Sequence, residues 1–274
     1  MCGIITLFGS DVDISSTLLT HRGPNDYRTE TLGKCRMDFY RLAINDLTDA
    51  GMQPFVQNKS MLVCNGEIYN HKEFRTGGEK GVSDCEVLLP MIEKYGILKT
   101  VDKINGDFAM VYTTGDRVIA ARDPVGVRPM FYTRYDVNSI AFASEAKALL
   151  SLKTEIHVFP PGHVYDSYID DFTCYYNTYW DIVPGRRHVP TKNLKQTLID
   201  AVHTRLDNTE RDIGFLLSGG LDSSLIASIA TKKIGKIKTF SIGLVGSPDL
   251  AAARKVAEYL DTDHTEVTFT TQEG

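Results

Sequence analysis

The chain has 274 residues, of which 42% are hydrophobic and 24% charged, and its formal net charge at pH 7 is −5. These values are ordinary for a folded globular protein, and the length is sufficient for one large domain or two smaller ones. Lys and Arg are scattered along an acidic chain, which argues against a protein that binds nucleic-acid phosphates with a basic surface. No apolar run reaches the roughly 18 residues of a membrane-spanning helix.

The N-terminus and the cysteines indicate a cytoplasmic protein. The first residues lack the positively charged segment that begins a secretory signal. The number of cysteines is odd and no two form a C-x-x-C pair, which favours neither a disulfide framework nor a zinc site. They are Cys2, Cys35, Cys64, Cys85 and Cys174. We therefore expect a reducing cytoplasmic environment and no association with membranes.

The first two-thirds of the chain is typical of β-structure. Short runs rich in Val, Ile, Phe and Tyr predict strands or turns at 2–9, 34–45, 61–66, 107–113, 117–122, 129–133 and 139–143. A helix is predicted after Ser83, because Glu86 follows three residues later as in a capping box and apolar residues follow at 87–92. We expect a mainly β domain with one or two helices packed on it.

The pattern changes near residue 185. Residues 183–190 are polar and bounded by prolines, as in a linker. Helices are then expected near 193–206, 222–233 and 249–260, and strands at 212–217, 237–243 and 264–269. Strands that alternate with helices indicate a doubly wound parallel sheet. The sequence thus predicts a first domain at 2–185 and a second domain of a different class at 186–274.

Cys2 is the first candidate for chemistry, although a cysteine at this position is by itself most often incidental. The small side chain permits removal of the initiator Met, which leaves Cys2 with a free α-amine. Such an amine has a pKa of about 8 and suits a general base. Nucleophile and base then belong to one residue, and the thiolate can attack an amide carbon such as that of glutamine.

Other residues have the chemistry that this reaction needs. The Asn65 side-chain amide and the Gly66 main-chain N–H are candidates for an oxyanion hole, although an Asn-Gly pair alone more often marks a turn. Arg41 is a candidate for the substrate carboxylate, and Asp84, assisted by Glu67, for the substrate amine. Taken singly, charged residues of these kinds are more often structural.

The order of the motifs is more specific than any one of them. Met-Cys-Gly-Ile at the N-terminus is followed by His21–Pro24, Arg41–Ile44, Gln53–Pro54, Asn65–Asn70, Ser83–Val87, Asn105–Ala109, Ala121–Pro129 and Phe142–Leu149. This series resembles the glutaminase domain of glutamine-dependent asparagine synthetases over almost its whole length. The resemblance implies an α+β sandwich of two mainly antiparallel sheets flanked by helices, the N-terminal-nucleophile glutaminase fold.

The resemblance also assigns roles to residues. It implies that Cys2 is the nucleophile and that Asn65 and Gly66 form the oxyanion hole. The glutamine site then combines these two residues with Arg41, Leu42, Ala43, Ile44, Asn45, Glu67 and Asp84. Asn25 departs from the family, in which Pro24 is usually followed directly by Asp, and this departure leaves the role of Arg22 open.

A second motif, residues 218–223 with the sequence Ser-Gly-Gly-Leu-Asp-Ser, follows a predicted strand and opens a helix. Glycine-rich loops in this context bind phosphate. This loop lacks the ending of a Walker A motif and resembles the pyrophosphate loop of ATP pyrophosphatases, as in the synthetase half of the same family. The resemblance implies that ATP contacts Leu217, Ser218, Gly219, Gly220, Asp222, Ser223, Ser241 and Ile242, and that Asp222 helps to hold Mg²⁺.

The implied reaction joins both halves. Ammonia released from glutamine at Cys2 attacks an aspartate that ATP has activated as its β-aspartyl-adenylate. Only three clear strands follow residue 186, whereas a doubly wound nucleotide-binding sheet generally has roughly five or more. We therefore expect this chain alone to act only as a glutaminase. A homodimer, and a separate chain that supplies the rest of the synthetase half, are both compatible with the sequence.

Three alternatives stay open. A β-lactam synthetase-like enzyme shares both halves of the fold but is expected to lack the N-terminal cysteine. A phosphoribosylpyrophosphate amidotransferase is expected to share the first domain but not the loop at 218–223. A catalytically silent regulatory or structural relative is a different class of protein, and it predicts an intact fold without release of ammonia.

Overall fold

The computed structural model describes residues 1–12, 14–15, 17–75, 83–177 and 191–273. The chain forms two units, Met1–Asp181 and Ile182–Gly274, and each is described by itself. The linker predicted at 183–190 and the boundary at 185 lie outside the described residues. No helix within the described ranges has both the length and the apolar character needed to cross a membrane.

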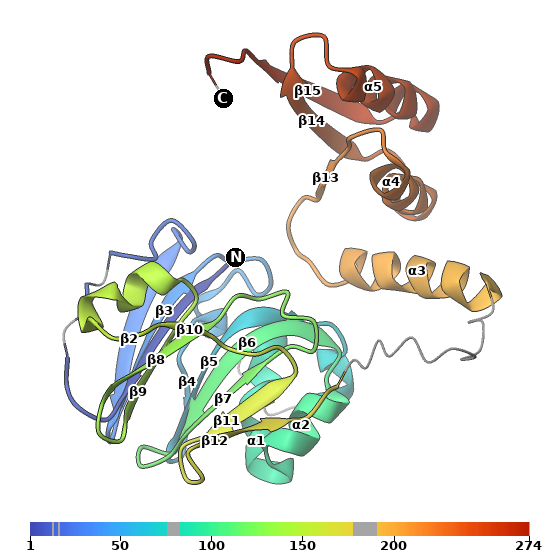
Figure 1. Cartoon of the computed structure of the whole chain (residues 1–274). Helices are drawn as coiled ribbons and strands as arrows, with labels where there is room; N and C mark the ends of the chain where they lie inside the picture. Colours follow the sequence, from blue (N-terminus) through green and yellow to red (C-terminus); the bar gives the residue numbers. More distant parts are fainter. Residues whose placement is uncertain (13, 16, 76–82, 178–190, 274) are drawn as a thin grey trace, which may run out of the picture. The chain divides into compact units, whose positions relative to one another are not determined.

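The first unit is a sandwich of two six-stranded sheets in which every strand pair is antiparallel (Figure 1). The first sheet has the order β10-β8-β9-β1-β3-β2. Its strands are β1 (Gly3–Phe8), β2 (Asp26–Leu32), β3 (Cys35–Arg41), β8 (Phe131–Asp136), β9 (Ser139–Ala143) and β10 (His157–Val158). The predicted strands at 2–9, 34–45, 129–133 and 139–143 all belong to it.

The second sheet has the order β12-β11-β7-β6-β5-β4. Its strands are β4 (Phe55–Gln57), β5 (Ser60–Ile68), β6 (Gly106–Thr113), β7 (Val118–Arg122), β11 (His163–Asp166) and β12 (Asp171–Cys174). Helices α1 (Leu88–Tyr95) and α2 (Ile97–Lys103) pack on its outer face, where Leu88 and Val101 share a buried cluster with Phe108. The predicted sandwich of antiparallel sheets with flanking helices is confirmed.

Alternation along the strands explains why this unit has layered cores. In β1, Ile4 and Phe8 belong to the core between the sheets, whereas Ile5 and Leu7 belong to a second cluster on the outer face. That second cluster includes Leu149 from the 3₁₀ segment η4 (Ala146–Leu152). Because successive side chains of a strand point to opposite faces, β1 is buried at every position only when both faces are covered.

The chain around Ser83 differs from the prediction. A 3₁₀ turn, η3 (Asp84–Val87), precedes α1, and the Ser83 side chain makes no capping hydrogen bond. In this tight turn the Glu86 N–H donates to the Ser83 carbonyl, an i→i+3 bond of 3.4 Å, and is thereby directed away from the Ser83 hydroxyl. The predicted capping box is therefore wrong. The remaining short 3₁₀ segments are η1 (Asp49–Gly51) and η2 (His71–Phe74).

The strands that the sequence pattern did not predict are polar or very short. β2 (sequence DYRTETL) lies at the edge of its sheet and is mostly exposed, so it lacks the apolar run by which a strand is recognised. β10 has only two residues, and β11 and β12 have four each. The predicted strand at 34–45 ends earlier, at Arg41, where the chain leaves the sheet for the candidate site.

The second unit is a three-stranded parallel sheet with the order β13-β14-β15. Its elements are α3 (Thr191–Leu206), β13 (Gly214–Leu216), α4 (Leu221–Ile234), β14 (Lys238–Leu244), α5 (Pro248–Leu260) and β15 (Asp263–Phe269). Its core combines strand and helix residues, including Leu217, Ala227, Ile237 and Ala253. The predicted parallel α/β arrangement is confirmed, with β13 shorter than the strand expected at 212–217.

Candidate active site

Strand alternation brings the candidate residues of the first unit to one place. Cys2 packs against the core between the sheets, with the same parity as Ile4 in β1. Arg41 follows Phe39 by two residues in β3, and Asn65 follows Val63 by two residues in β5; both Phe39 and Val63 belong to that core. Period-two alternation thus directs all three side chains toward the space between the two sheets.

Cys2 lies beside the segment that follows Arg41. The antiparallel register pairs Gly3 with Tyr40, so Cys2, the residue before β1, falls opposite Arg41 at the end of β3. The Cys2 Sγ atom lies 3.4 Å from the Leu42 nitrogen and 3.5 Å from the Leu42 oxygen. Burial raises the pKa of the Cys2 thiol, so a base is needed to generate the thiolate at neutral pH.

Asn65 supplies an unused donor to the same pocket. Its side chain is 1% exposed, and its Nδ2 has no hydrogen-bond partner among the described residues. A buried amide without a partner is costly and is usually retained for a function. Gly66 follows it, and a Cβ atom there would lie 2.5 Å from the Asp107 carbonyl oxygen. The close approach of β5 to β6 therefore requires glycine at this position.

Arg41 is buried and held by the main chain. Its Nη1 donates to the Thr48 carbonyl at 2.7 Å, and its Nη2 donates to the Asp46 carbonyl. A guanidinium has five N–H donors, so three remain for a carboxylate. Arg41 therefore has a structural role as well as the predicted binding role.

Acidic groups also line the pocket. Asp84 is 5% exposed and its Oδ2 accepts a hydrogen bond of 2.6 Å from the Ile68 main-chain nitrogen. Glu67 forms an ion pair of 3.0 Å with Arg128. Burial raises the pKa of Glu67, and Arg128 opposes that rise. The pocket thus offers the two carboxylates of Asp84 and Glu67 together with the Arg41 cation.

Most of the predicted glutamine-binding residues line this pocket. It is lined by Cys2, Arg41, Leu42, Ile44, Asn45, Asn65, Gly66, Glu67 and Asp84, together with Met1, Gln53 and Arg128 among others. Ala43 does not line it, and its main-chain nitrogen donates to the Asn25 Oδ1 at 3.0 Å. The Asn25 nitrogen in turn donates to the Arg41 carbonyl, so the residue that departs from the family pattern holds the Arg41–Ala43 segment.

Two of these pocket residues were not singled out from the sequence. Arg128 lies in the quoted motif Ala121–Pro129, and the Asp123 carboxylate fixes its turn by accepting from the Arg128 nitrogen at 3.0 Å. Gln53 holds the strand below Asn65, because its Oε1 accepts from the Cys64 nitrogen at 2.6 Å and its Nε2 donates to the Cys64 carbonyl. Both residues lie in motifs quoted from the sequence, Ala121–Pro129 and Gln53–Pro54. Membership of these motifs was the signal that could have identified them.

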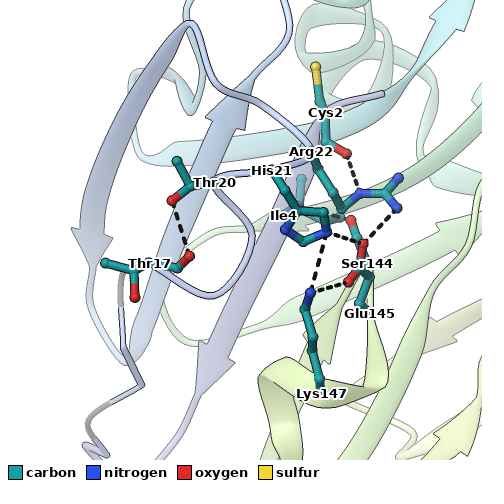
Figure 2. Close-up of polar contacts among 9 residues, drawn as sticks. All are labelled: Cys2, Ile4, Thr17, Thr20, His21, Arg22, Ser144, Glu145 and Lys147. Carbon is teal, nitrogen blue, oxygen red and sulfur yellow. Dashed lines mark hydrogen bonds and ion pairs between the residues drawn. The ribbon is translucent and has the colours of Figure 1, made fainter.

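The structure shows which groups Arg22, whose role the sequence left open, contacts. Its Nε donates to the Cys2 carbonyl oxygen at 3.0 Å, and its Nη1 pairs with Glu145 at 3.1 Å (Figure 2). Arg22 therefore contacts the main chain of the candidate nucleophile and not the pocket itself.

The second unit presents its predicted loop at the carboxyl end of β13. Gly219 has φ +77°, and a Cβ atom there would lie 2.5 Å from the Ala253 nitrogen, so the turn requires glycine. The Ser218 and Ser223 hydroxyls lie 3.0 Å apart, and no side chain caps the α4 N-terminus. Helix N-termini with small loop residues are suited to binding phosphate.

The predicted adenine-binding residues differ in exposure. Leu217 is 1% exposed, its side chain belongs to the core of the unit, and its nitrogen donates to the Phe240 carbonyl at 2.8 Å. Ile242 is 68% exposed, and the Ser241 hydroxyl lies 3.1 Å from the His264 Nε2. Because β13 and β14 are neighbouring parallel strands, this segment and the loop at 218–223 lie at the same end of the sheet.

Comparison with known proteins agrees with both halves. Residues 1–187 match the family model described as the glutamine amidotransferase domain, and residues 193–274 match the model described as asparagine synthase. Curated relatives named as glutamine-hydrolysing asparagine synthetases include one from Oryza sativa (38% identity), one from Arabidopsis thaliana (39%) and one from Mus musculus (37%). Each alignment covers 100% of this chain and, respectively, 51%, 52% and 57% of the relative. The chain thus spans about half the length of these relatives.

Solved structures share the fold at low sequence identity. One is the glutamine phosphoribosylpyrophosphate amidotransferase from B. subtilis, with a TM-score of 0.51 and 17% identity, covering 97% of this chain and 65% of that chain. Another is titled the allosteric regulatory enzyme of purine biosynthesis, with a TM-score of 0.52 and 17% identity, covering 87% and 64%. From the family matches over both halves, the chain belongs to the family of glutamine-dependent asparagine synthetases, with a glutamine amidotransferase domain joined to residues of an asparagine synthase domain.

Proposed function

We propose that this chain hydrolyses glutamine to glutamate and ammonia at Cys2, and that the ammonia serves ATP-dependent amidation of aspartate to asparagine. The observation that carries the proposal is the shared pocket of Cys2 and Asn65. A thiol and a buried amide donor without a partner are the two groups that attack on an amide carbon requires.

The first step needs a base beside a thiol whose pKa is raised. The N-terminus of the chain lines the same pocket, and burial lowers the pKa of its amine, which favours the neutral form. Removal of Met1 takes this amine away and converts the Cys2 nitrogen, one residue further along, from an amide into the new terminal amine. The new amine accepts the thiol proton, the thiolate adds to the glutamine amide carbon, and the electron pair moves to the amide oxygen.

The oxyanion then receives hydrogen bonds from the Asn65 amide and the Gly66 main chain, as proposed from the sequence. Collapse of this intermediate transfers the proton to the leaving nitrogen, releases ammonia, and leaves a thioester on Cys2. Water, deprotonated by the same amine, cleaves the thioester to glutamate and restores the thiol. The two steps together consume one glutamine and one water.

The charges of the pocket match the head group of glutamine. We propose that the Arg41 donors not used by Thr48 and Asp46 bind the α-carboxylate, together with main-chain groups of residues 42–45. Asp84 and Glu67, which line the same pocket, bind the α-ammonium. Both charged groups are on the α-carbon, so holding them fixes that end of glutamine and leaves its side-chain amide to reach Cys2.

The second unit is proposed to bind ATP through residues 218–223 and through Leu217, Ser241 and Ile242. A Mg²⁺ ion at a nucleotide usually takes one or two carboxylates together with phosphate oxygens and water, so the single carboxylate of Asp222 in the first turn of α4 fits this ion. No group of three or more acidic, His or Cys side chains that would form a complete protein cage for a metal is found in the described ranges. When bound, Mg²⁺ neutralises pyrophosphate charge.

The other inferences from the sequence stay proposals. The relatives are about twice as long, so we propose that asparagine formation also needs synthetase residues beyond those matched here, in the same polypeptide or in a partner chain. A homodimer is equally compatible. All five cysteines are unpaired, which fits a reducing compartment such as the cytoplasm.

The proposal is tested by incubating the chain with glutamine, aspartate and Mg-ATP while glutamate, pyrophosphate and asparagine are each followed. We expect glutamate and ammonia from the parent chain, none from Cys2→Ala or Cys2→Ser, and no asparagine. Circular dichroism of the variants is the folding control. If the parent chain releases no ammonia, the protein is the catalytically silent relative. Stoichiometric asparagine and pyrophosphate would refute the expectation that the chain has glutaminase activity alone.

A further inference from the structure

Glu145 is the centre of a charged cluster next to the N-terminal strand (Figure 2). Its Oε1 lies 2.8 Å from the His21 Nε2 and 3.1 Å from the Arg22 Nη1, and its Oε2 lies 3.0 Å from the Lys147 Nζ. Three basic side chains therefore converge on one carboxylate. Two of them come from the loop before β2 and one from the start of η4.

Arg22 connects this cluster to the candidate nucleophile. Its side chain is 9% exposed, with the Nε donating to the Cys2 carbonyl at 3.0 Å and the Nη1 donating to Glu145. A guanidinium is planar, so fixing one edge on a carboxylate fixes the direction of the other N–H groups. The orientation of the Cys2 peptide thus depends on Glu145 through Arg22.

Ser144, the residue before Glu145, bonds to strand β1 at Ile4. The Ile4 nitrogen donates to the Ser144 Oγ at 3.0 Å, and the Ser144 nitrogen donates to the Ile4 carbonyl at 3.0 Å. Ser144 therefore bonds directly to Ile4, and Glu145 supports Cys2 through Arg22, on the two sides of Gly3. The Cys2 side chain itself points away from this cluster, as Figure 2 shows.

The charge of Glu145 is permanent at physiological pH. Partial burial raises the pKa of Glu145, but hydrogen bonds from His21, Lys147 and Arg22 outweigh it and lower the pKa to about 2. The Glu145 carboxylate therefore stays ionised at neutral pH and keeps its ion pair with the Arg22 guanidinium.

We propose that Glu145 is a positioning residue for the Cys2 nucleophile, acting through Arg22. This inference rests on the proposed glutaminase function. Glu145 does not touch the substrate pocket, so its loss leaves glutamine binding largely intact and reduces the fraction of enzyme in which the thiol and the amine are aligned. A misplacement of about 1 Å costs on the order of 100-fold in rate.

The test compares Glu145→Ala and Glu145→Gln with two matched controls. Lys147→Met removes a partner of Glu145 that has no contact with Cys2, and Asp166→Asn breaks the Arg117 ion pair elsewhere in the same unit. For Glu145→Ala we expect kcat for ammonia release to fall about 10-fold to 100-fold with KM within about twofold. Glu145→Gln keeps an oxygen acceptor for Arg22 and is expected to be intermediate, and both controls near the parent.

A second readout does not depend on activity. Hydrogen–deuterium exchange of residues 2–8 is expected to rise in Glu145→Ala and to stay unchanged in Asp166→Asn. A kcat within twofold of the parent overturns the proposal. So does exchange that rises equally throughout the first unit, because that is a general loss of stability. If the parent releases no ammonia, the glutaminase proposal fails, and the exchange experiment decides the positioning role separately.

Discussion

The Cys2 thiol and the Leu42 main chain are in direct contact, with Sγ 3.4 Å from the Leu42 nitrogen. Leu42 follows Arg41, whose guanidinium is fixed by the Thr48 and Asp46 carbonyls. The proposed nucleophile therefore lies against the segment that carries the proposed carboxylate-binding residue. The placement of Cys2 relative to Arg41 is set by the pairing of β1 with β3, which makes the following predictions specific.

Replacing Asn65 by Ala is expected to lower kcat for glutamine hydrolysis by roughly 100-fold to 1,000-fold, as loss of one oxyanion donor does. KM is expected to change little, since the donor acts on the charge that develops during the reaction. Stability is not expected to fall, because the Asn65 Nδ2 has no partner to lose. Steady-state kinetics and thermal unfolding measure the two effects. Asn70→Ala is the control, since Asn70 bonds to Lys103 and Asn105 outside the pocket.

Replacing Asp84 by Asn is expected to raise KM for glutamine by about 10-fold to 150-fold, the equivalent of roughly 1.5–3 kcal/mol for a charged contact. Asn keeps an oxygen that can accept from the Ile68 nitrogen, so the melting temperature is expected to change little. Arg41→Ala is a less selective test, because it also removes the guanidinium hydrogen bonds to the Thr48 and Asp46 carbonyls and so lowers stability. Asp84→Asn binding glutamine like the parent would show that the head group lies elsewhere.

Retention of Met1, or any N-terminal tag, is expected to abolish glutaminase activity almost as completely as Cys2→Ala. The Cys2 nitrogen is then an amide, which is not a base near neutral pH. Intact mass gives the processed fraction of each preparation, and activity is expected to be proportional to it. A carboxyl-terminal tag serves as the control, and equal activity of blocked and processed chains would exclude the amine as base.

The Glu145 carboxylate is expected to stabilise the fold above about pH 4.5 and to lose that effect as the pH falls toward 2. Its ordinary pKa of 4.5 is lowered to about 2 in the folded state: burial opposes this change, and His21, Lys147 and Arg22 drive it. A lowered pKa means that folding favours the ionised form, so protonation costs stability. Urea unfolding of the parent and Glu145→Gln is expected to differ by about 1 kcal/mol at pH 7, because the pairs are partly solvated, and the difference is expected to disappear as the pH falls through about 2. A difference that is constant with pH would contradict this assignment.

Much of the site was readable from the sequence because it depends on local chemistry. Cys2 at the N-terminus, the Asn65-Gly66 pair and Asp84 were each proposed from residue type and from the order of motifs. The structure brings Cys2, Asn65, Gly66 and Asp84 to one pocket. In the second unit, alternating strands and helices predicted the parallel sheet. The spacing of apolar residues and the turn residues between elements are properties of short segments, so they can be recognised in the sequence.

The partners of these residues were decided only by the tertiary structure. Arg128 meets Glu67 across 61 positions, and Arg22 meets Glu145 across 123. Contacts at such separations follow from the stacking of two sheets and the pairing of β1 with β3 and β9, which no local pattern determines. Local sequence also did not predict the edge strand β2, whose residues are mostly polar, or the 3₁₀ turn η3 after Ser83. Local sequence thus determined which groups have the chemistry for the reaction, and packing of distant strands decided which of them are held in place.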